Sequence, residues 1–399
     1  MEQIKYSLEN KGFKQLIAVS IGHFTNDFFV GLIAPISVYF AYKLGLNLTQ
    51  QGMISVAVLV FSSLLQPVFG LLSDKKGKPK HLIISIIWIS VFISLSGVIS
   101  NFYILLLVIV LGSSASALYH PLGSTTAVTL GRNAKGTSLS IFMTIGGFAG
   151  TVASIVGLWI ANKFGIEKIV YLALPGLLVA GFMFYSEVQN IKIDTYENRK
   201  KDNIGDKIEE VKKLNLSKKS MFWLGILIYI SIMKVLSGRF IITYGIQILF
   251  LKNFAYGAAL LSIHLLGRPI GTMSGGILID KIGEKKVFIF GMLLSLISLA
   301  LIGYGGSWIA AVGVGTLGFC TSLTNTVGVL VSHKIIPDSQ SFATGIIMGI
   351  PGGIGSLTMI IFSGLADSNG LIYSVKALVI PFLIATVLTY FILYRRENI

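Results

Sequence analysis

The sequence predicts an all-α integral membrane protein whose twelve transmembrane helices form two pseudo-symmetric six-helix bundles. Of its 399 residues, 54% are apolar and only 12% are charged, whereas about 25% of the residues in an average soluble domain are charged. Apolar runs of the length that a membrane span needs, about 20 residues, follow one another along the chain. A motif at residues 70–80 also returns at residues 276–286, which indicates a duplicated bundle.

The apolar runs are separated by short breaks that contain Gly, Pro, Asn or Lys. Many of their residues are Ile and Val, but in lipid only helices and closed barrels satisfy every backbone polar group, and barrel strands would alternate polar with apolar residues. These runs do not alternate. We therefore expect helices at residues 15–43, 50–73, 82–100, 103–130, 137–162, 168–187, 221–250, 256–279, 287–304, 307–332, 341–366 and 371–394.

The formal net charge of +15 is explained by its distribution along the chain. If residue 1 is cytoplasmic and the chain crosses twelve times, 24 of the 32 Lys and Arg residues lie in inner segments and five in outer segments. This bias follows the positive-inside rule. It predicts a multi-pass protein of the cell membrane with both termini in the cytoplasm, whose partner is the lipid bilayer and not a nucleic acid.

One long polar segment, residues 188–220, divides the chain into an N-terminal bundle at 1–187 and a C-terminal bundle at 221–399. Its basic character predicts a cytoplasmic linker. Within it, Ile208, Val211 and Leu214 fall on one stripe, so a short surface helix and a solvated loop both fit. The lone Cys320 excludes an internal disulfide and provides no metal-ligand cluster. We expect no metal and no cofactor.

Each copy of the repeated motif closes the second helix of its bundle at the predicted cytoplasmic end. The copies resemble the G-x-x-x-D-[RK]-x-G-[RK] loop of the major facilitator superfamily, and the resemblance implies that fold and a role for the loop in locking the cytoplasmic side. Glycine permits close helix approach, and the Asp carboxylate can face a neighbouring helix N-terminus or a basic side chain. The gate residues so predicted are Gly70, Asp74, Lys75, Gly77 and Lys78, and in the second copy Asp280, Lys281 and Gly283.

Three further stretches are similar to the fosmidomycin-resistance branch of the superfamily. They read "HFTND" at 23–27, "SSLLQPVFGLLSDKKG" at 62–77 and "YHPLGS" at 119–124. The branch resemblance rests mainly on the N-terminal half, while the resemblance to the superfamily covers the whole chain. It implies proton-coupled efflux of a small compound.

The first span carries the ionisable group that we expect to handle protons. His23, Asn26 and Asp27 lie at i, i+3 and i+4 on one helical face. A charged group at the centre of a span costs about 2.5–3.5 kcal/mol, so it calls for a cavity, a partner or a function. Asp27 is therefore a candidate for proton coupling. A static carboxylate that bridges two helices is the alternative.

His120 is the second coupling candidate, because imidazole titrates near neutral pH. It precedes Pro121 in the fourth span, where proline removes a backbone donor and can kink the helix. A hydrogen-bonded packing histidine is the alternative for His120, and it is the favoured interpretation of His23. His23, Asn26 and Tyr119 are nevertheless also expected to line the substrate site.

The C-terminal half carries basic groups at membrane depth. The candidate substrate-binding residues there are Lys234, Arg239, Arg268 and Asn325. For Arg239, a side chain that extends to the outer end of its helix is the alternative. The repeat offset places Lys234 opposite the neighbour of Asp27, so the two bundles are expected to present an acid and a base to one central space. Three embedded cations favour an anionic or electron-rich substrate.

The predicted function is secondary active transport of a small, anionic or polar organic compound by alternating access, with proton-coupled efflux first and proton-coupled uptake of an organic anion as the alternative. The chain has no G-x-x-x-x-G-K-[ST] stretch, which argues against an ATP-driven pump. Its five histidines are scattered, without H-E-x-x-H, which argues against an enzyme. The expected partners are the substrate, protons and lipid, and we expect a monomer.

Overall fold

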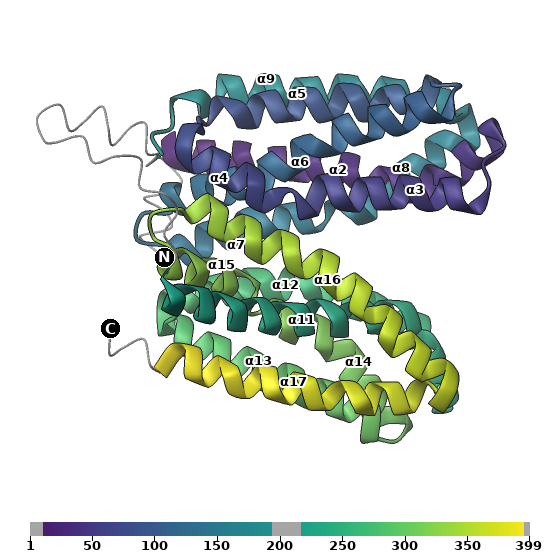
Figure 1. The fold of residues 1–399 in the computed structure, drawn as a ribbon, viewed down its shortest axis with the longest axis vertical. Coiled ribbons are helices and arrows are strands. Elements are labelled where there is room, and N and C mark those ends of the chain that lie inside the picture. Colours follow the sequence, from purple (N-terminus) through teal and green to yellow (C-terminus); the bar gives the residue numbers. More distant parts are fainter. Residues whose placement is uncertain (1–10, 194–216, 395–399) are drawn as a thin grey trace, which may run out of the picture. The chain divides into compact units, whose positions relative to one another are not determined.

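The computed structural model describes residues 11–193 and 217–394, and these are almost entirely helical (Figure 1). Each of the twelve predicted apolar runs coincides with described helix, so the predicted fold class is confirmed. The helices are α2 (Lys11–Leu44), α3 (Leu48–Leu59), α4 (Gln66–Lys76), α5 (Lys80–Leu95), α6 (Phe102–Leu130), α7 (Lys135–Gly147), α8 (Ala149–Phe164), α9 (Ala173–Tyr185), α11 (Lys218–Leu251), α12 (Gly257–Ile282), α13 (Glu284–Tyr304), α14 (Ser307–Ser322), α15 (Asn325–Ile335), α16 (Gln340–Asn369) and α17 (Leu371–Tyr394).

Several predicted spans are built from two helical pieces. A π-helical turn at Val60–Leu64 joins α3 to α4, a 3₁₀ helix at Ile166–Leu172 precedes α9, and α7 meets α8 at Phe148. Proline does not always break a helix here, because α6 continues through Pro121. The kink expected at Pro121 therefore does not interrupt the fourth span.

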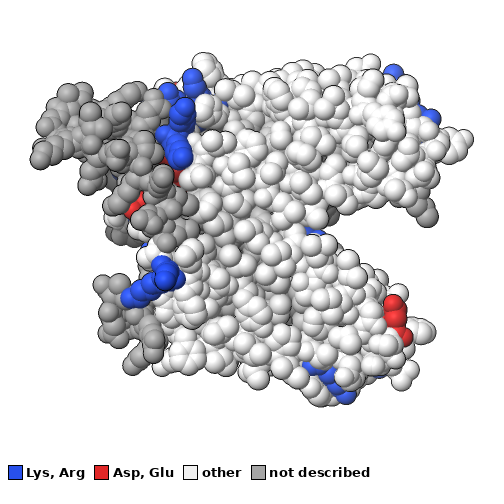
Figure 2. Space-filling view, in the orientation of Figure 1, with Lys and Arg blue, Asp and Glu red and all other residues white. Residues whose placement is uncertain are grey.

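Eleven of the described helical stretches are long and apolar enough to cross a membrane. The helix α12, which carries the predicted eighth span, is not among them although it is 26 residues long. Its sequence holds His264 and Arg268 within the apolar run and Asp280 and Lys281 at its end, and these polar groups dilute its apolar content. Large apolar side chains such as Leu178 and Ile360 are exposed on the helix flanks, as lipid-facing residues are. Figure 2 shows the charged side chains mostly near the ends of the helices.

The chain forms two compact units, Met1–Val211 with Asp338–Gly349, and Lys212–Pro337 with Ile350–Ile399. The start of α16 thus belongs with the first unit. Of the predicted linker, the described residues form a 3₁₀ turn at Val188–Asn190 and the first turn of α11. The surface helix considered for Ile208, Val211 and Leu214 falls outside the described residues.

In the first unit, α2 is the central helix and packs against α5, α6, α7, α8 and α9. Its apolar face contributes Phe29, Leu32, Ile33, Ile36 and Phe40 to the core. Its polar residues then necessarily face neighbouring helices as well. The first turn of α2 is held by a pair that the sequence did not suggest, because Lys11 contacts Glu187, just past α9. The hydrogen bond from Lys11 lowers the pKa of the Glu187 carboxyl.

Candidate functional site

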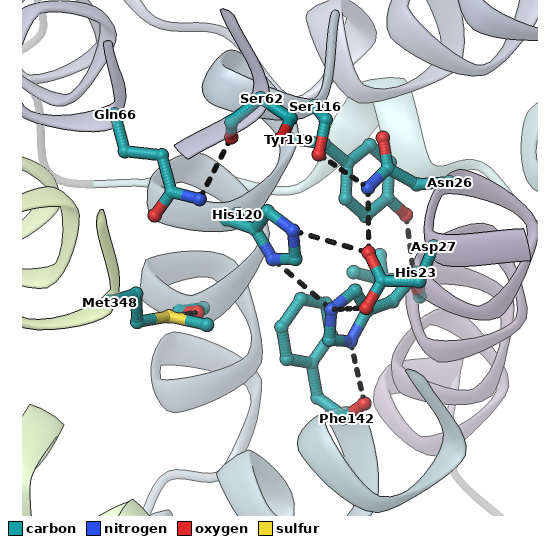
Figure 3. Close-up of polar contacts among 12 residues, drawn as sticks. His23, Asn26, Asp27, Ser62, Gln66, Ser116, Tyr119, His120, Phe142 and Met348 are labelled. Carbon is teal, nitrogen blue, oxygen red and sulfur yellow. Dashed lines mark hydrogen bonds and ion pairs between the residues drawn. The ribbon is translucent and has the colours of Figure 1, made fainter. Parts of the chain in front are cut away.

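The first unit brings His23 and Asp27 of α2 together with His120 of α6 inside the helix bundle (Figure 3). The i, i+4 spacing puts the two α2 side chains on one face, as predicted, and the packing of α6 on α2 adds the third. The Asp27 Oδ2 atom lies 3.3 Å from His23 Nε2, and Oδ1 lies 3.1 Å from His120 Nε2. His23 Nε2 also lies 3.2 Å from His120 Nδ1. We call these three residues the His–Asp–His cluster.

The ring of His23 is held more firmly than that of a lone packing histidine. Its Nδ1 donates to the Phe142 carbonyl oxygen at 2.8 Å, and the ring stacks on Phe142 with 4.0 Å between centroids. Gly146 makes room for the ring, since a Cβ at that position would lie 2.3 Å from His23 Nδ1. Phe142 and Gly146 of α7 were missed by sequence reasoning. The Phe142 contact is made by a backbone atom, which leaves no signal in the sequence.

Asn26 and Tyr119, both predicted to bind substrate, are fully buried and bonded within the unit. Asn26 Nδ2 donates to Asp27 Oδ1 and to Ser116 Oγ, each at 2.9 Å. The Tyr119 hydroxyl donates to the Val19 carbonyl oxygen at 2.7 Å. Both side chains therefore support the helix pair that carries the cluster, and neither is open to a ligand in this state. Their role in substrate binding stays a prediction.

Exposure differs among the members of the cluster. The side chain of Asp27 is 28% exposed, that of His120 13% and that of His23 only 4%. Among the described residues, these three also form a group whose ligand atoms lie within 4.8 Å of one another, close enough to hold a metal ion. We assign no metal, because the rings and the carboxylate already contact one another directly, an arrangement that protons between them stabilise.

The predicted gate residue Asp74 lies at the end of α4 and caps another helix. Its two carboxylate oxygens accept hydrogen bonds from the backbone N–H groups of Ser341 and Phe342, at 2.9 and 2.8 Å, in the first turn of α16. A helix N-terminus or a basic side chain was expected to face this carboxylate, and the structure shows the helix N-terminus. Gly70 permits the approach, since a Cβ there would lie 2.4 Å from the Ser341 carbonyl oxygen.

The other gate residues lie in the last turns of α4 and α12 or directly after them. Lys75 is in the last turn of α4, and Gly77, which ends that helix, donates to the Ser73 carbonyl oxygen at 2.7 Å, with Lys78 next in the chain. In the second copy, Asp280 and Lys281 lie in the last turn of α12, and Gly283 ends it with a φ of +86°. The helices α4 and α12 therefore end differently, because the backbone of Gly77 is extended and that of Gly283 has a positive φ.

The basic candidates of the second unit lie on α11 and α12. Lys234 Nζ donates to Asn325 Oδ1 at 3.0 Å, and Asn325 Nδ2 donates to Thr272 Oγ1 at 3.3 Å. Arg239 and Arg268 are both exposed. Among the residues that the structure describes, neither guanidinium has a carboxylate partner. The pairing of Asp27 with Lys234 stays a prediction, since these residues belong to different units.

Comparisons with known proteins agree with this architecture. A family model described as the Major Facilitator Superfamily matches residues 19–267 and 237–398. The chain is 25% identical to the fosmidomycin resistance protein of Escherichia coli (strain K12) over 372 residues, which cover 92% of this chain and 90% of that protein. It is 22% identical to the uncharacterized MFS-type transporter YfnC of Bacillus subtilis (strain 168), with 89% and 87% covered. The resemblance expected from the motifs is confirmed.

Solved structures show the same fold at low identity. The E. coli fucose:proton symporter FucP superposes with a TM-score of 0.69 at 14% identity, covering 96% of this chain and 99% of that one. The proton:xylose symporter XylE gives a TM-score of 0.69 at 13% identity, with 94% of each chain covered.

Proposed function

This chain belongs to the Major Facilitator Superfamily, and on that premise we propose that it exports a small anionic or polar organic compound in exchange for protons. Family and fold make the protein a multi-pass membrane transporter and not an enzyme. Transporters of this kind bind substrate near the midplane between their two repeats, and rock the repeats about that site. Substrate class, coupling ion and direction are the parts that we propose.

The His–Asp–His cluster is the observation that carries proton coupling. An ionisable group inside a membrane protein is costly and marks a pathway or a relay, and here three titratable side chains from two helices contact one another. A carboxylate that only bridged α2 to α6 would need one partner. Asp27 instead contacts two imidazoles, the side chain whose charge changes near neutral pH.

The basic residues of the second unit support an anionic substrate. Arg239 and Arg268 are exposed and have no carboxylate partner within the described chain, so an anion bound beside them would meet positive charge that no acidic side chain there neutralises. Arginine is well suited to this task because its planar fork of donors matches carboxylates and phosphates. Lys234, held by Asn325, would add a third positive charge.

Export is supported by the relative from E. coli, a protein named for resistance to fosmidomycin. A membrane transporter can confer resistance to a compound by expelling it from the cell. Uptake of an organic anion together with protons remains the alternative direction, and the transport experiment described next decides between export and uptake.

The test uses purified full-length protein in liposomes. Counterflow of radiolabelled phosphonates, carboxylates and sugars identifies the substrate class, and we expect anions to exchange and neutral sugars to fail. With that substrate, an imposed pH gradient across vesicles of known protein orientation gives the direction. Export in exchange for protons predicts that substrate and protons cross the membrane in opposite directions. Movement of substrate in the same direction as protons would establish the uptake alternative. Transport that ignores the pH gradient would refute proton coupling.

A further inference from the structure

The three contacts inside the His–Asp–His cluster restrict where its protons can sit. Each contact joins two atoms that can both carry a lone pair, so each needs a proton between them. His23 Nδ1 faces the Phe142 carbonyl oxygen, which can only accept a hydrogen bond. The first proton on His23 is therefore fixed at Nδ1. In neutral His23, the Nε2 atom is then a bare lone pair that faces both Asp27 Oδ2 and His120 Nδ1.

With both rings neutral and Asp27 ionised, the cluster cannot satisfy its contacts. The contact between His23 Nε2 and Asp27 Oδ2 has no proton, and the single proton of His120 serves either its Nδ1 or its Nε2 contact. The cluster would also carry a net negative charge inside the membrane, which is costly. One added proton removes the charge.

That added proton can reside on three residues, which we call its possible seats, and only one of these positions satisfies every contact. On His120, it leaves the His23 Nε2 lone pair against Asp27 Oδ2. On Asp27, it leaves either the two facing ring nitrogens or the His120 contact with Oδ1 without a proton. On His23 Nε2, it serves both Asp27 Oδ2 and His120 Nδ1, while the His120 proton at Nε2 serves Asp27 Oδ1.

Asn26 points to the same seat. Its Nδ2 donates to Asp27 Oδ1, so this oxygen accepts from both Asn26 and His120, which excludes a proton on Oδ1 itself. Of the titratable side chains that the structure describes around His23, α2 offers Asp27 and α6 offers His120 and Tyr119. The Tyr119 hydroxyl is committed to the Val19 carbonyl oxygen, and α7 presents the Phe142 carbonyl and ring. A second added proton would set N–H against N–H between the two rings.

We propose that His23 is the seat of the coupling proton, as an imidazolium paired with an Asp27 that stays ionised, and that the cluster takes up one proton per cycle. His120 is a positioning residue, which accepts from His23 and donates to Asp27. On release, the His23 Nε2–H bond breaks, the ring keeps the electron pair and the proton passes to water by way of the more exposed Asp27 and His120. The single remaining proton of His120 then serves only one of its two contacts with α2, the one to His23 Nε2 or the one to Asp27 Oδ1, so proton loss weakens the contact of α2 with α6. This inference rests on the proposed proton coupling.

The first test is spectroscopic and needs no substrate. Full-length protein labelled with ¹⁵N-histidine in lipid nanodiscs is titrated while histidine nitrogen shifts and the infrared carboxyl region are recorded. We expect one imidazolium signal that disappears in His23→Gln, persists in His120→Gln and is unchanged in His81→Gln, the control outside the cluster. In the infrared spectrum, we expect Asp27→Asn to remove no protonated-carboxyl band, because Asp27 stays ionised. Such a band, or an imidazolium signal lost in His120→Gln only, would overturn the proposal.

The second test counts protons. Lowering the pH of weakly buffered protein should bind about one proton at the cluster, one for the single unmet seat, measured as the difference between wild type and His23→Gln. The His120→Gln variant should keep this uptake. A difference of two protons, or of none, would contradict the proposal. If one proton binds at His23 but transport ignores the pH gradient, the seat is correct and the proposed function fails. If a variant does not fold, the wild-type nitrogen shifts and the wild-type infrared carboxyl region together still report whether an imidazolium coexists with an ionised carboxylate.

Discussion

The carboxylate of Asp74 accepts a hydrogen bond from the backbone N–H of Ser341, 267 positions further along the chain. Its other oxygen accepts from Phe342, so one side chain satisfies two of the N–H groups that a helix N-terminus leaves without partners. The negative charge also meets the positive end of the α16 dipole. This helix cap thus links the end of α4 to the start of α16.

Replacing Asp74 with Ala should shift the balance between outward-open and inward-open states. Losing an N-cap costs about 0.5–2 kcal/mol, and a change of 1.4 kcal/mol is about a factor of ten. If the cap exists in only one state, that state should lose population by about twofold to thirtyfold, because a change acts only through its differential effect on the two states. Distances between spin labels at the ends of α4 and α16 would measure the shift.

The matched variant is Asp280→Ala in the second copy. We expect a smaller effect, because Glu284 stands at the position of Lys78 and pairs with Lys334 at 2.7 Å, which makes this copy degenerate. Unchanged distance distributions in Asp74→Ala would show that the carboxylate caps the helix without controlling the balance.

The fold could be predicted from composition because lipid leaves the backbone few options. Spans of about 20 apolar residues have to be helices wherever they do not alternate, so even runs rich in Ile and Val were assigned correctly. The breaks within spans were not predicted. The π-helical turn at Val60–Leu64 depends on how α3 and α4 pack, and packing between helices is a tertiary property that a local pattern does not contain.

The sequence predicted only those contacts of the site that lie within one helix. The i, i+4 spacing placed His23 beside Asp27, but His23 was interpreted mainly as a packing residue because its partners lie elsewhere. His120 reaches the pair from α6, and the carbonyl of Phe142 and the space at Gly146 come from α7. These relationships arise from helix packing. The pseudo-symmetry argument predicts that Asp27 and Lys234 face one central space, and this stays a prediction. Within their own units, Asp27 contacts His120 and Lys234 donates to Asn325.

The variant Asp27→Asn should abolish transport driven by a pH gradient while substrate counterflow persists. The amide keeps a hydrogen-bonding side chain but removes the charge that stabilises an imidazolium at His23. Substrate exchange without a pH gradient needs no net proton movement, so it reports that the protein is folded. Active transport against a gradient in Asp27→Asn would exclude the cluster as the coupling site.

Adding one methyl group at Gly146 should disturb the cluster without touching a titratable residue. In Gly146→Ala the new Cβ would lie 2.3 Å from His23 Nδ1, so the ring must move and its bond to Phe142 is lost. Gly147→Ala is the control, because a Cβ there meets nothing within 4 Å. Both changes share the helix-propensity gain of about 1 kcal/mol. We expect pH-driven transport to fall in the first variant only, and equal transport in both would contradict the role of His23.

The predicted topology can be tested with single cysteines in a Cys320→Ser background. The positive-inside rule predicts that the exposed Lys76 is cytoplasmic. It predicts that the exposed Ala255, between α11 and α12, is external. In intact cells, a membrane-impermeant thiol reagent should label Ala255→Cys and spare Lys76→Cys, and lysis should expose both. Labelling of both positions in intact cells would refute the twelve-span orientation.

The basic residues of the second unit give the last prediction, which concerns substrate affinity. A hydrogen bond to a charged group contributes about 1.5–3 kcal/mol, so Arg268→Gln should weaken binding of an anionic substrate by about tenfold to 150-fold. Lys234→Gln should weaken it less, because Lys234 already donates to Asn325 and would have to share that contact with the substrate. The exposed Lys286, near the start of α13, supplies the control Lys286→Gln, which removes one positive charge outside the candidate site. Equilibrium binding of the anion identified by counterflow, measured at two ionic strengths, separates local contacts from the general field of the protein, since salt screens exposed charges most. An affinity that changes equally in Arg268→Gln and Lys286→Gln would show that overall charge attracts the substrate and that Arg268 does not contact it.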